Sequence, residues 1–422
     1  MQTKTLSLVA LLASLAASTS GCSASASVDG GRDADDATAT RIPDDASSSI
    51  DAGESAPIDG GPATVGTYDG PVADAACPKL PAAGQWQNIS PPGSNYTQTY
   101  TGINAVVVRP DDPAVVYTGA DSNGIFKSSD CGATWALVNT GTHAKDLSSG
   151  RPWSMAIDPV TPDVMYVVEG YGTSGLWKST NAGVDWQQIL TPNITSAFYS
   201  GGQITGLSVD PADHTHLVIE SHGNCASGNL CSAESSDSGA TWRLIEMPSV
   251  GAWAENSTVA ILDRKTWLYC GLFSGLYRTA DEGTSWQAMD AGSLPSCNYY
   301  EPYVWQAKDG RYYVPAIAYA GPGLLRSLPG DTSTWSIVAN APQDEVLIPT
   351  GVSLVAAKSD GTYSIASQSD PTTWKTFTGP AAGSAAVKGN LGGGAYFMAY
   401  DGTHHVLYAS TFSTGLWQTV ID

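Results

Sequence analysis

Short apolar runs separated by turn-forming residues make up the chain from about residue 84 onward. In the first unit of this pattern they predict four strands, here called a to d, over 103–110, 115–120, 124–128 and 134–138. The runs are rich in Val, Ile, Tyr and Phe and are bounded by Gly, Pro, Asp and Asn, which is typical of strands joined by turns. No stretch has the pattern of a helix of any length. The pattern therefore predicts an all-β protein.

An eight-residue motif, S-x-D-x-G-x-x-W, recurs within this pattern. Its copies occupy 128–135, 179–186, 235–242 and 279–286, and decayed copies end at Trp335 and Trp374. The motif is the Asp-box: Ser and Asp side chains bond the backbone of a tight turn, and Gly takes a positive φ. Successive tryptophans are 39 to 56 residues apart, which is the size of a four-stranded propeller blade.

The strand that precedes each motif copy gives the number of blades. Such strands are expected at 124–128, 175–179, 230–235, 275–279, 323–327, 361–367 and 415–419. The last has no Asp-box after it, and Trp86 begins a Trp strand with no blade before it. We expect the N-terminal strand near Trp86 to complete the last blade, because closure removes exposed sheet edges. The prediction is a seven-bladed β-propeller over 77–422.

The N-terminus has a different composition. Lys4 precedes an apolar run from Leu6 to Ala17, and small residues lead to Cys22, so residues 1–22 have the pattern of a secretory signal too short to span a membrane. Ser-Gly-Cys22 resembles a bacterial lipobox, with Thr19 where that motif usually has Leu. The resemblance implies that Cys22 is lipidated and anchors the chain to an outer membrane or cell surface. The alternative is an ordinary cleaved signal and a secreted protein.

Residues 23–76 consist mainly of Ala, Ser, Asp, Gly and Pro, with 11 acidic residues against Arg32 and Arg41. Such a segment buries too little to offset its ordering entropy, so we predict a disordered acidic linker. The net charge of the chain is −21. This excludes nucleic acid as a partner, because nucleic acid requires a basic face. Any contact with a membrane is expected through the lipid anchor alone.

The chain has seven cysteines, and six remain when Cys22 is set aside. An even number in an exported protein indicates disulfides. The pairing that best fits the repeat order is Cys225–Cys231, Cys270–Cys297 and Cys77–Cys131. A metal site is the alternative, but no CxxC or His-rich spacing accompanies the cysteines. We therefore expect no metal and no cofactor.

Strand order assigns the loops to two faces of the ring. The a–b turns and the Asp-boxes share one face, and the b–c and d–a connections share the other. Long loops concentrate on the second face, and long loops are where function tends to lie. Aromatic rings there offer platforms for sugar rings, although each single ring has packing under a loop as its alternative. The candidate ligand-binding residues are Trp153, Tyr171, Tyr199, His222, Trp253, Tyr300 and Trp305.

Three acidic residues occupy matching positions after strand b of the first three blades: Asp121, Glu169 and Glu220. Neighbouring carboxylates can serve as an acid/base pair when their environments separate their pKa values. Glycoside hydrolysis needs such a pair, about 6.5–9.5 Å apart for inversion. The alternative for each residue is a solvated charge or a loop hydrogen bond. His222, near Glu220, is a further acid/base candidate.

Asp-box propellers occur in sialidases, sortilin receptors, a photosystem II assembly factor and glycoside hydrolase family 74 xyloglucanases. Residues 116–128 (VYTGADSNGIFKS) resemble the first-blade segment of family 74, and 152–186 is similar in style. The resemblance implies that Asp121 is a general base. Asn123 departs from the family's T-D-x-G-G context at its first Gly. The family's acid comes from a second propeller, so here Glu169, Glu220 or another subunit would have to supply it.

Sialidases hold a carboxylate with three arginines, and by our strand assignment only Arg151 lies in a loop of the second face. This argues against a sialidase. Two hypotheses remain. The favoured one is a surface-tethered propeller that binds a glycan or a partner protein through its aromatic and acidic loops. The other is an endo-acting glycoside hydrolase with Asp121 as base and Glu169 or Glu220 as acid. A third, an assembly factor or receptor for a partner protein, predicts an apolar surface patch instead.

Overall fold

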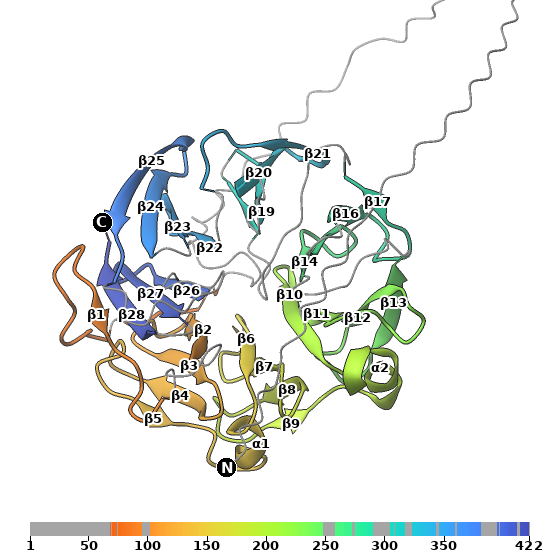
Figure 1. Ribbon diagram of the computed structural model, residues 1–422, viewed down its shortest axis with the longest axis horizontal. Helices are drawn as coiled ribbons and strands as arrows, with labels where there is room; N and C mark the ends of the chain where they lie inside the picture. The colour runs from red at the N-terminus through yellow and green to blue at the C-terminus, as the bar shows by residue number, and fades with distance from the viewer. Residues whose placement is uncertain are drawn as a thin grey trace, which may run out of the picture. The chain divides into compact units, whose positions relative to one another are not determined.

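The computed structural model describes residues 68, 70–73, 75–94, 102–247, 258–271, 275–289, 304–307, 309–316, 323–342, 346–358, 361–380, 395, 397–411 and 414–421. The signal predicted for 1–22 and most of the linker predicted for 23–76 lie outside these residues. The described part is nearly all-β and forms seven antiparallel four-stranded sheets arranged as the blades of a propeller (Figure 1). The predicted fold is confirmed.

The first six blades each consist of four consecutive strands. Where Figure 1 labels the first strand of a blade, that strand lies nearest the centre of the ring. The first three blades are β2 (Ile103–Val108), β3 (Val116–Ala120), β4 (Gly124–Ser128) and β5 (Ala136–Leu137); β6 (Pro152–Ile157), β7 (Met165–Glu169), β8 (Gly175–Ser179) and β9 (Gln187–Gln188); and β10 (Ile204–Asp210), β11 (Asp213–Ser221), β12 (Leu230–Ser235) and β13 (Arg243–Met247). The next three are β14 (Thr258–Ile261), β15 (Trp267–Gly271), β16 (Gly275–Thr279) and β17 (Gln287–Ala288); β18 (Trp305–Gln306), β19 (Tyr312–Ala316), β20 (Gly323–Leu328) and β21 (Asp331–Ile337); and β22 (Val346–Pro349), β23 (Ser353–Ala357), β24 (Thr362–Ser367) and β25 (Asp370–Thr378).

The seventh blade joins the two ends of the propeller. It contains β26 (Phe397–Asp401), β27 (Val406–Thr411) and β28 (Gly415–Val420), and its outer strand is β1 (Gln87–Asn88) from the N-terminal side. Gln87 pairs with Gln418 and Asn88 with Trp417, and Figure 1 shows β1 beside β28. Closure by an N-terminal strand therefore occurs as predicted, although the closing strand is only two residues long.

The Asp-box turns have the bonding that the motif predicts. In the first copy the Ser128 hydroxyl accepts a hydrogen bond from the Gly132 amide (2.8 Å), and Asp130 Oδ1 accepts one from the Thr134 amide (2.8 Å). Gly132 has a φ of 86°, where a side chain would be strained. In the fifth and sixth blades, where the motif has decayed, strands c and d continue into tight hairpins that pair Leu328 with Asp331 and Ser367 with Asp370.

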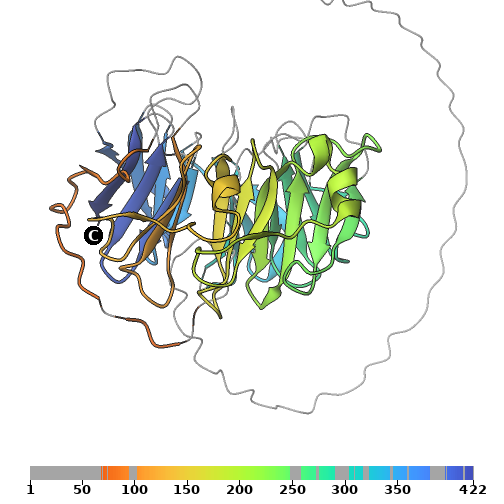
Figure 2. The same ribbon diagram turned by 90° about the horizontal axis from the view of Figure 1, so that it is seen from below.

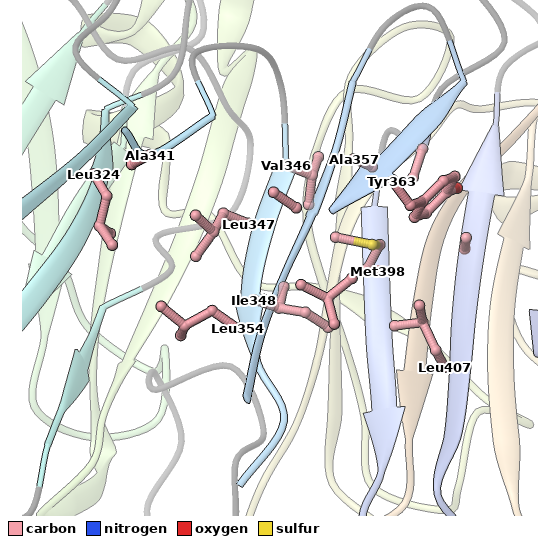
Figure 3. Packing of buried hydrophobic residues seen from close by; sticks show 14 of the residues in the cluster. Leu324, Ala341, Val346, Leu347, Ile348, Leu354, Ala357, Tyr363, Met398 and Leu407 are labelled. Atoms are coloured by element: carbon pink, nitrogen blue, oxygen red, sulfur yellow. The ribbon is translucent and has the colours of Figure 1, made fainter. Parts of the chain in front are cut away.

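Apolar side chains of neighbouring blades pack face to face and form the core. One cluster combines the fifth, sixth and seventh blades. In Figure 3 side chains of β22 and β23 lie between Leu324 on one side and Met398 and Leu407 on the other. The five strands that carry these side chains, β20, β22, β23, β26 and β27, have almost continuous buried residues, as strands enclosed on both faces do.

Two short helices were not predicted from the sequence. α1 (Ala144–Leu147) lies in the connection from the first to the second blade, and α2 (Pro192–Ala197) in the connection from the second to the third. A 3₁₀ turn, η1 (Tyr199–Gly201), follows α2. Both helices lie toward the same face of the ring, seen as gold and green coils in Figure 2. Each buries one apolar side chain, Leu147 or Ile194. In the described ranges, no helix has the length and apolar character needed to cross a membrane.

Two of the predicted disulfides are present, Cys77–Cys131 and Cys225–Cys231. Cys270 is also disulfide-bonded. Cys297, its predicted partner, lies outside the described residues.

Candidate functional site

A cavity of about 880 Å³ opens on the predicted functional face, beside the second blade. Its lining comes from α1 and the residue before it, the b–c loops of the second and third blades, the outer strands β8 and β9, and the loop that contains η1. We call it the second-blade cavity. Its lining residues are His143, Asp146, Tyr171, Gly172, Thr173, Ser174, Trp177, Gln187, Gln188, Tyr199, Ser200, Gly201, Gln203 and His222.

Two tyrosine rings at this cavity stand out by their exposure. Tyr171 is 51% exposed and Tyr199 is 40% exposed. Among the Phe, Tyr and Trp side chains that the structure describes, these are the two exposed ones, and both line the same cavity. The sequence predicted both as ligand-binding residues.

Two largely buried rings, Trp153 and His222, pack against these tyrosines. His222 is 7% exposed and stacks on Trp153 with ring centroids 5.3 Å apart, and on Tyr199 at 6.2 Å. Tyr171 meets Trp153 edge-on at 5.0 Å. The stack fixes the two tyrosines, and His222 reaches the cavity although it is mostly buried.

The structure corrects two of the predicted aromatic contacts. Trp153 was expected in a loop but lies in β6, and Trp305 lies in β18; they are 2% and 4% exposed. Trp305 stacks on Tyr313 with centroids 5.0 Å apart. Both rings are core residues that present no free face to a ligand. Two other candidates, Trp253 and Tyr300, lie outside the described residues.

The general-base candidate Asp121 is held in a buried ion pair. It is 5% exposed, and its Oδ2 accepts a hydrogen bond from Arg151 Nε at 2.9 Å. Its Oδ1 accepts another from the Ser122 hydroxyl at 2.9 Å. The Arg151 guanidinium lies over the Tyr171 ring, 5.2 Å from its centroid, in a cation–π contact. Asp121 thus orients Arg151, which in turn packs against an exposed ring of the cavity.

Glu169, at the end of β7, is fully buried. Its two carboxylate oxygens have no hydrogen-bond partner within the described part of the chain. The side chain lies against Gly150, where an added Cβ would come within 2.1 Å of Oε2. Burial raises the pKa of Glu169 well above its ordinary value of 4.5, and the neighbouring charge of Asp121 raises it further.

Glu220 is turned toward the fourth blade. It is fully buried, and its Oε1 accepts a hydrogen bond from the Val259 amide of β14 at 2.8 Å. Burial raises its pKa well above 4.5, and the Val259 hydrogen bond partly opposes this. The structure therefore brings Asp121 and Glu169 into electrostatic contact, whereas Glu220 links two blades. The described lining of the second-blade cavity contains none of the three carboxylates.

Replacing Glu169 with glutamine should remove a pH dependence of stability. Because the folded-state pKa is raised, the folded chain keeps a proton that the unfolded chain loses, so stability falls as pH rises from about 4.5 toward the folded pKa. The amide of Glu169→Gln cannot ionise. The variant should be more stable than the parent near pH 7 and similar to it near pH 4, in urea unfolding at both pH values. Exposed Glu246→Gln is the control. An equal difference from the parent at both pH values would contradict the assignment.

Sequence reasoning missed part of the cavity lining. Asp146 lies in α1 and His143 directly precedes that helix; a hydrogen bond joins His143 Nδ1 and Asp146 Oδ2 (2.7 Å). The His143 ring contacts Trp177 at 5.3 Å. Trp177 was recognised only as part of the repeated strand GLWKS. Its position just after the b–c loop of the second blade was the available signal that it could reach the functional face.

The arginines have the predicted distribution. Arg151 directly precedes β6 in a d–a connection, whereas Arg264 and Arg311 lie at a–b turns, and Arg278 and Arg326 are in c strands. Of these five arginines, only Arg151 lies on the functional face, and a sialidase needs three. The argument against a sialidase therefore stands.

Comparisons with known proteins give distant similarity. No protein-family model matches the chain. A xyloglucanase from Acetivibrio thermocellus is 24% identical in an alignment of 229 residues that covers 45% of this chain and 26% of that enzyme. A xyloglucanase from Hypocrea jecorina is 28% identical in an alignment of 199 residues that covers 44% of this chain and 20% of that enzyme. The match thus spans about a quarter of the length of these curated relatives.

Solved structures share the propeller fold. A GH74 xyloglucanase from Xanthomonas campestris superposes with a TM-score of 0.52 and 17% identity over 79% of this chain and 53% of its own. YCF48 bound to a D1 peptide superposes with a TM-score of 0.53 and 15% identity over 83% of this chain and 99% of its own. The chain therefore resembles family 74 propellers in fold and, at low identity, xyloglucanases in sequence.

Proposed function

We propose that this propeller binds a polysaccharide at the second-blade cavity and does not cleave it. One observation carries the proposal: the two exposed aromatic rings of the described chain, Tyr171 and Tyr199, line the same cavity. Sugar rings present apolar C–H faces, which stack on aromatic faces, and the stack beneath holds both rings in place.

Polar groups complete the chemistry that a sugar requires. Ligand sites typically combine aromatic surface with a few converging polar groups that fix orientation. Here the side chains of Asp146, Gln187 and Gln188 line the cavity and offer donors and acceptors for hydroxyl groups. The similarity to xyloglucanases supports a plant polysaccharide of the xyloglucan class as the ligand.

Hydrolysis is the second candidate, because Glu169 has a raised pKa and lies near a second carboxyl group, Asp121, as an acid does in an acid/base pair. Three features count against it. Asp121 is engaged by Arg151, both carboxyl groups are buried, and neither lines the cavity. A positioning role for Asp121, acting through Arg151 on Tyr171, accounts for its contacts better than a role as general base.

We also propose that the chain is exported and tethered at its N-terminus, with 1–22 as a lipoprotein-type signal, Cys22 as the lipidated residue and 23–76 as a linker. Disulfides support an oxidising compartment.

A partner protein is the alternative ligand, since the fold is also that of a protein solved with a bound peptide.

Binding and cleavage can be separated in one assay. The full chain and Asp121→Asn are incubated with a panel of plant and microbial polysaccharides, and both retardation in affinity gels and release of reducing ends are measured. We expect the parent to bind one polysaccharide class without releasing reducing ends. The affinity of Asp121→Asn should be lower by less than about tenfold, because Asp121 does not line the cavity and acts on Tyr171 only through Arg151. Release by the parent that Asp121→Asn loses would instead establish a hydrolase.

A further inference from the structure

Four potential metal ligands meet at the seam where the ring closes. Cys77 precedes β1, Cys131 lies in the first Asp-box, and Asp401 and His404 lie where β26 turns into β27. Each contributes one donor atom, and these atoms all lie within 4.8 Å of one another. In the structure the two sulfurs form a disulfide, so neither is a thiolate that could bind a metal. The sequence predicted no metal at the cysteines, and the members of this group are far apart in the chain.

The histidine of this group is oriented as metal-binding histidines are. His404 Nδ1 bonds Asp401 Oδ2 at 2.6 Å, and Asp401 is 1% exposed. Asp401 is itself fixed by bonds from the backbone amides of Thr403 (2.8 Å) and His404 (3.1 Å). Nε2 of His404 is buried and has no hydrogen-bond partner within the described ranges. A carboxylate that holds one imidazole nitrogen leaves the other with its lone pair available, as in carboxylate–histidine–zinc sites.

We propose that the Cys77–Cys131 disulfide and a zinc site are two states of this one cluster. A dithiol reductant supplies two electrons and two protons, which break the S–S bond and give two thiols, while the reductant closes its own disulfide. Zn²⁺ then binds the two sulfurs as thiolates and displaces the two thiol protons to solvent. His404 is the third ligand through Nε2, and Asp401 orients it.

The geometry of the cluster fits this exchange. Zinc bonds of about 2.0–2.3 Å in a tetrahedron place neighbouring ligand atoms about 3.3–3.8 Å apart. Each of the four residues has one donor atom within 4.8 Å of the others, so zinc binding needs side-chain shifts of about 1 Å or more, and the two sulfurs need to separate from bonding distance. Thiolate and imidazole ligands favour zinc over the harder divalent cations.

The cluster lies where a bound zinc ion would hold the closing segment of the chain to the first blade. Cys77 belongs to the segment that leads to the closing strand β1, and Cys131 belongs to the first blade. The disulfide between them holds the closing segment to the ring. In the reduced chain, a zinc ion bound to both cysteines would hold the two segments together before the disulfide forms. This inference is independent of the proposed polysaccharide binding.

The test compares zinc binding by full-length chains that carry Cys22→Ser, so that its thiol does not contribute. Each chain is reduced with dithiothreitol, desalted without oxygen, mixed with Zn²⁺, desalted again and assayed for zinc; Co²⁺ replaces Zn²⁺ in a parallel series to detect thiolate ligation by absorption. His404→Gln keeps a donor for Asp401 but removes the imidazole. Cys225→Ser/Cys231→Ser removes a disulfide that lies outside the cluster.

We expect the reduced parent to retain about one zinc ion per chain and the oxidised parent to retain none. His404→Gln should bind at least about tenfold more weakly while melting like the parent when oxidised, as expected for loss of a metal ligand. The Cys225→Ser/Cys231→Ser chain should bind like the parent. Three results would each overturn the proposal: no zinc on the reduced parent, equal affinity in His404→Gln, or equal loss in the Cys225→Ser/Cys231→Ser chain.

Discussion

Replacing Cys77 and Cys131 together with serine is expected to lower the free energy of unfolding by about 4 kcal/mol. The disulfide joins residues 54 positions apart, so it removes a large amount of chain entropy from the unfolded state. It also fastens the segment that enters β1, a strand of two residues with few backbone bonds of its own. Urea unfolding without reductant measures the loss.

The second disulfide is the control for this result. Cys225 and Cys231 are six positions apart, so their replacement by serine should cost about 2 kcal/mol by the same entropy relation. Equal losses for the two pairs, or a larger loss for Cys225→Ser/Cys231→Ser, would contradict a special role for the seam.

The repeated sequence determined most of the fold prediction. Each Asp-box marks a c–d turn through bonds within eight residues, so the c strand before it could be located without knowledge of distant contacts. Closure was predicted from two incomplete units: the strand at Trp86 has no blade before it, and the c strand at 415–419 has no Asp-box after it. β1 and β28 do pair. α1 and α2 were missed because four and six residues are too few to produce a helical period.

The site was less predictable because its properties depend on what covers each side chain. The rings of Trp153 and Tyr171 were both assigned to exposed loops, but Tyr171 and His222 cover Trp153 and leave it 2% exposed. The acidic residues were expected after strand b at matching positions, but only Asp121 follows its strand. Glu169 is the last residue of β7 and Glu220 lies within β11. Their partners could not be predicted from the sequence, since Glu220 accepts a hydrogen bond from the amide of Val259, 39 residues further along and in another blade.

Removing both exposed rings of the second-blade cavity is the other change with a large expected effect. Each ring stacked on a sugar contributes about 1.4 kcal/mol, or about tenfold in affinity, so Tyr171→Ala/Tyr199→Ala should bind about 100-fold more weakly than the parent. Both side chains are exposed, so the variant should melt close to the parent. Tyr171→Phe/Tyr199→Phe keeps both stacking faces and should retain most of the affinity. Leu328→Ala, which removes an exposed apolar side chain of the fifth blade, should bind like the parent.

The most direct test of polysaccharide binding at the second-blade cavity is calorimetric titration of these four chains with the polysaccharide that the parent retains. The account predicts heat of binding for the parent, for Tyr171→Phe/Tyr199→Phe and for Leu328→Ala, and a loss of about 100-fold in affinity for Tyr171→Ala/Tyr199→Ala. Equal affinity of the parent and the alanine variant would place the ligand elsewhere on the propeller and contradict the account.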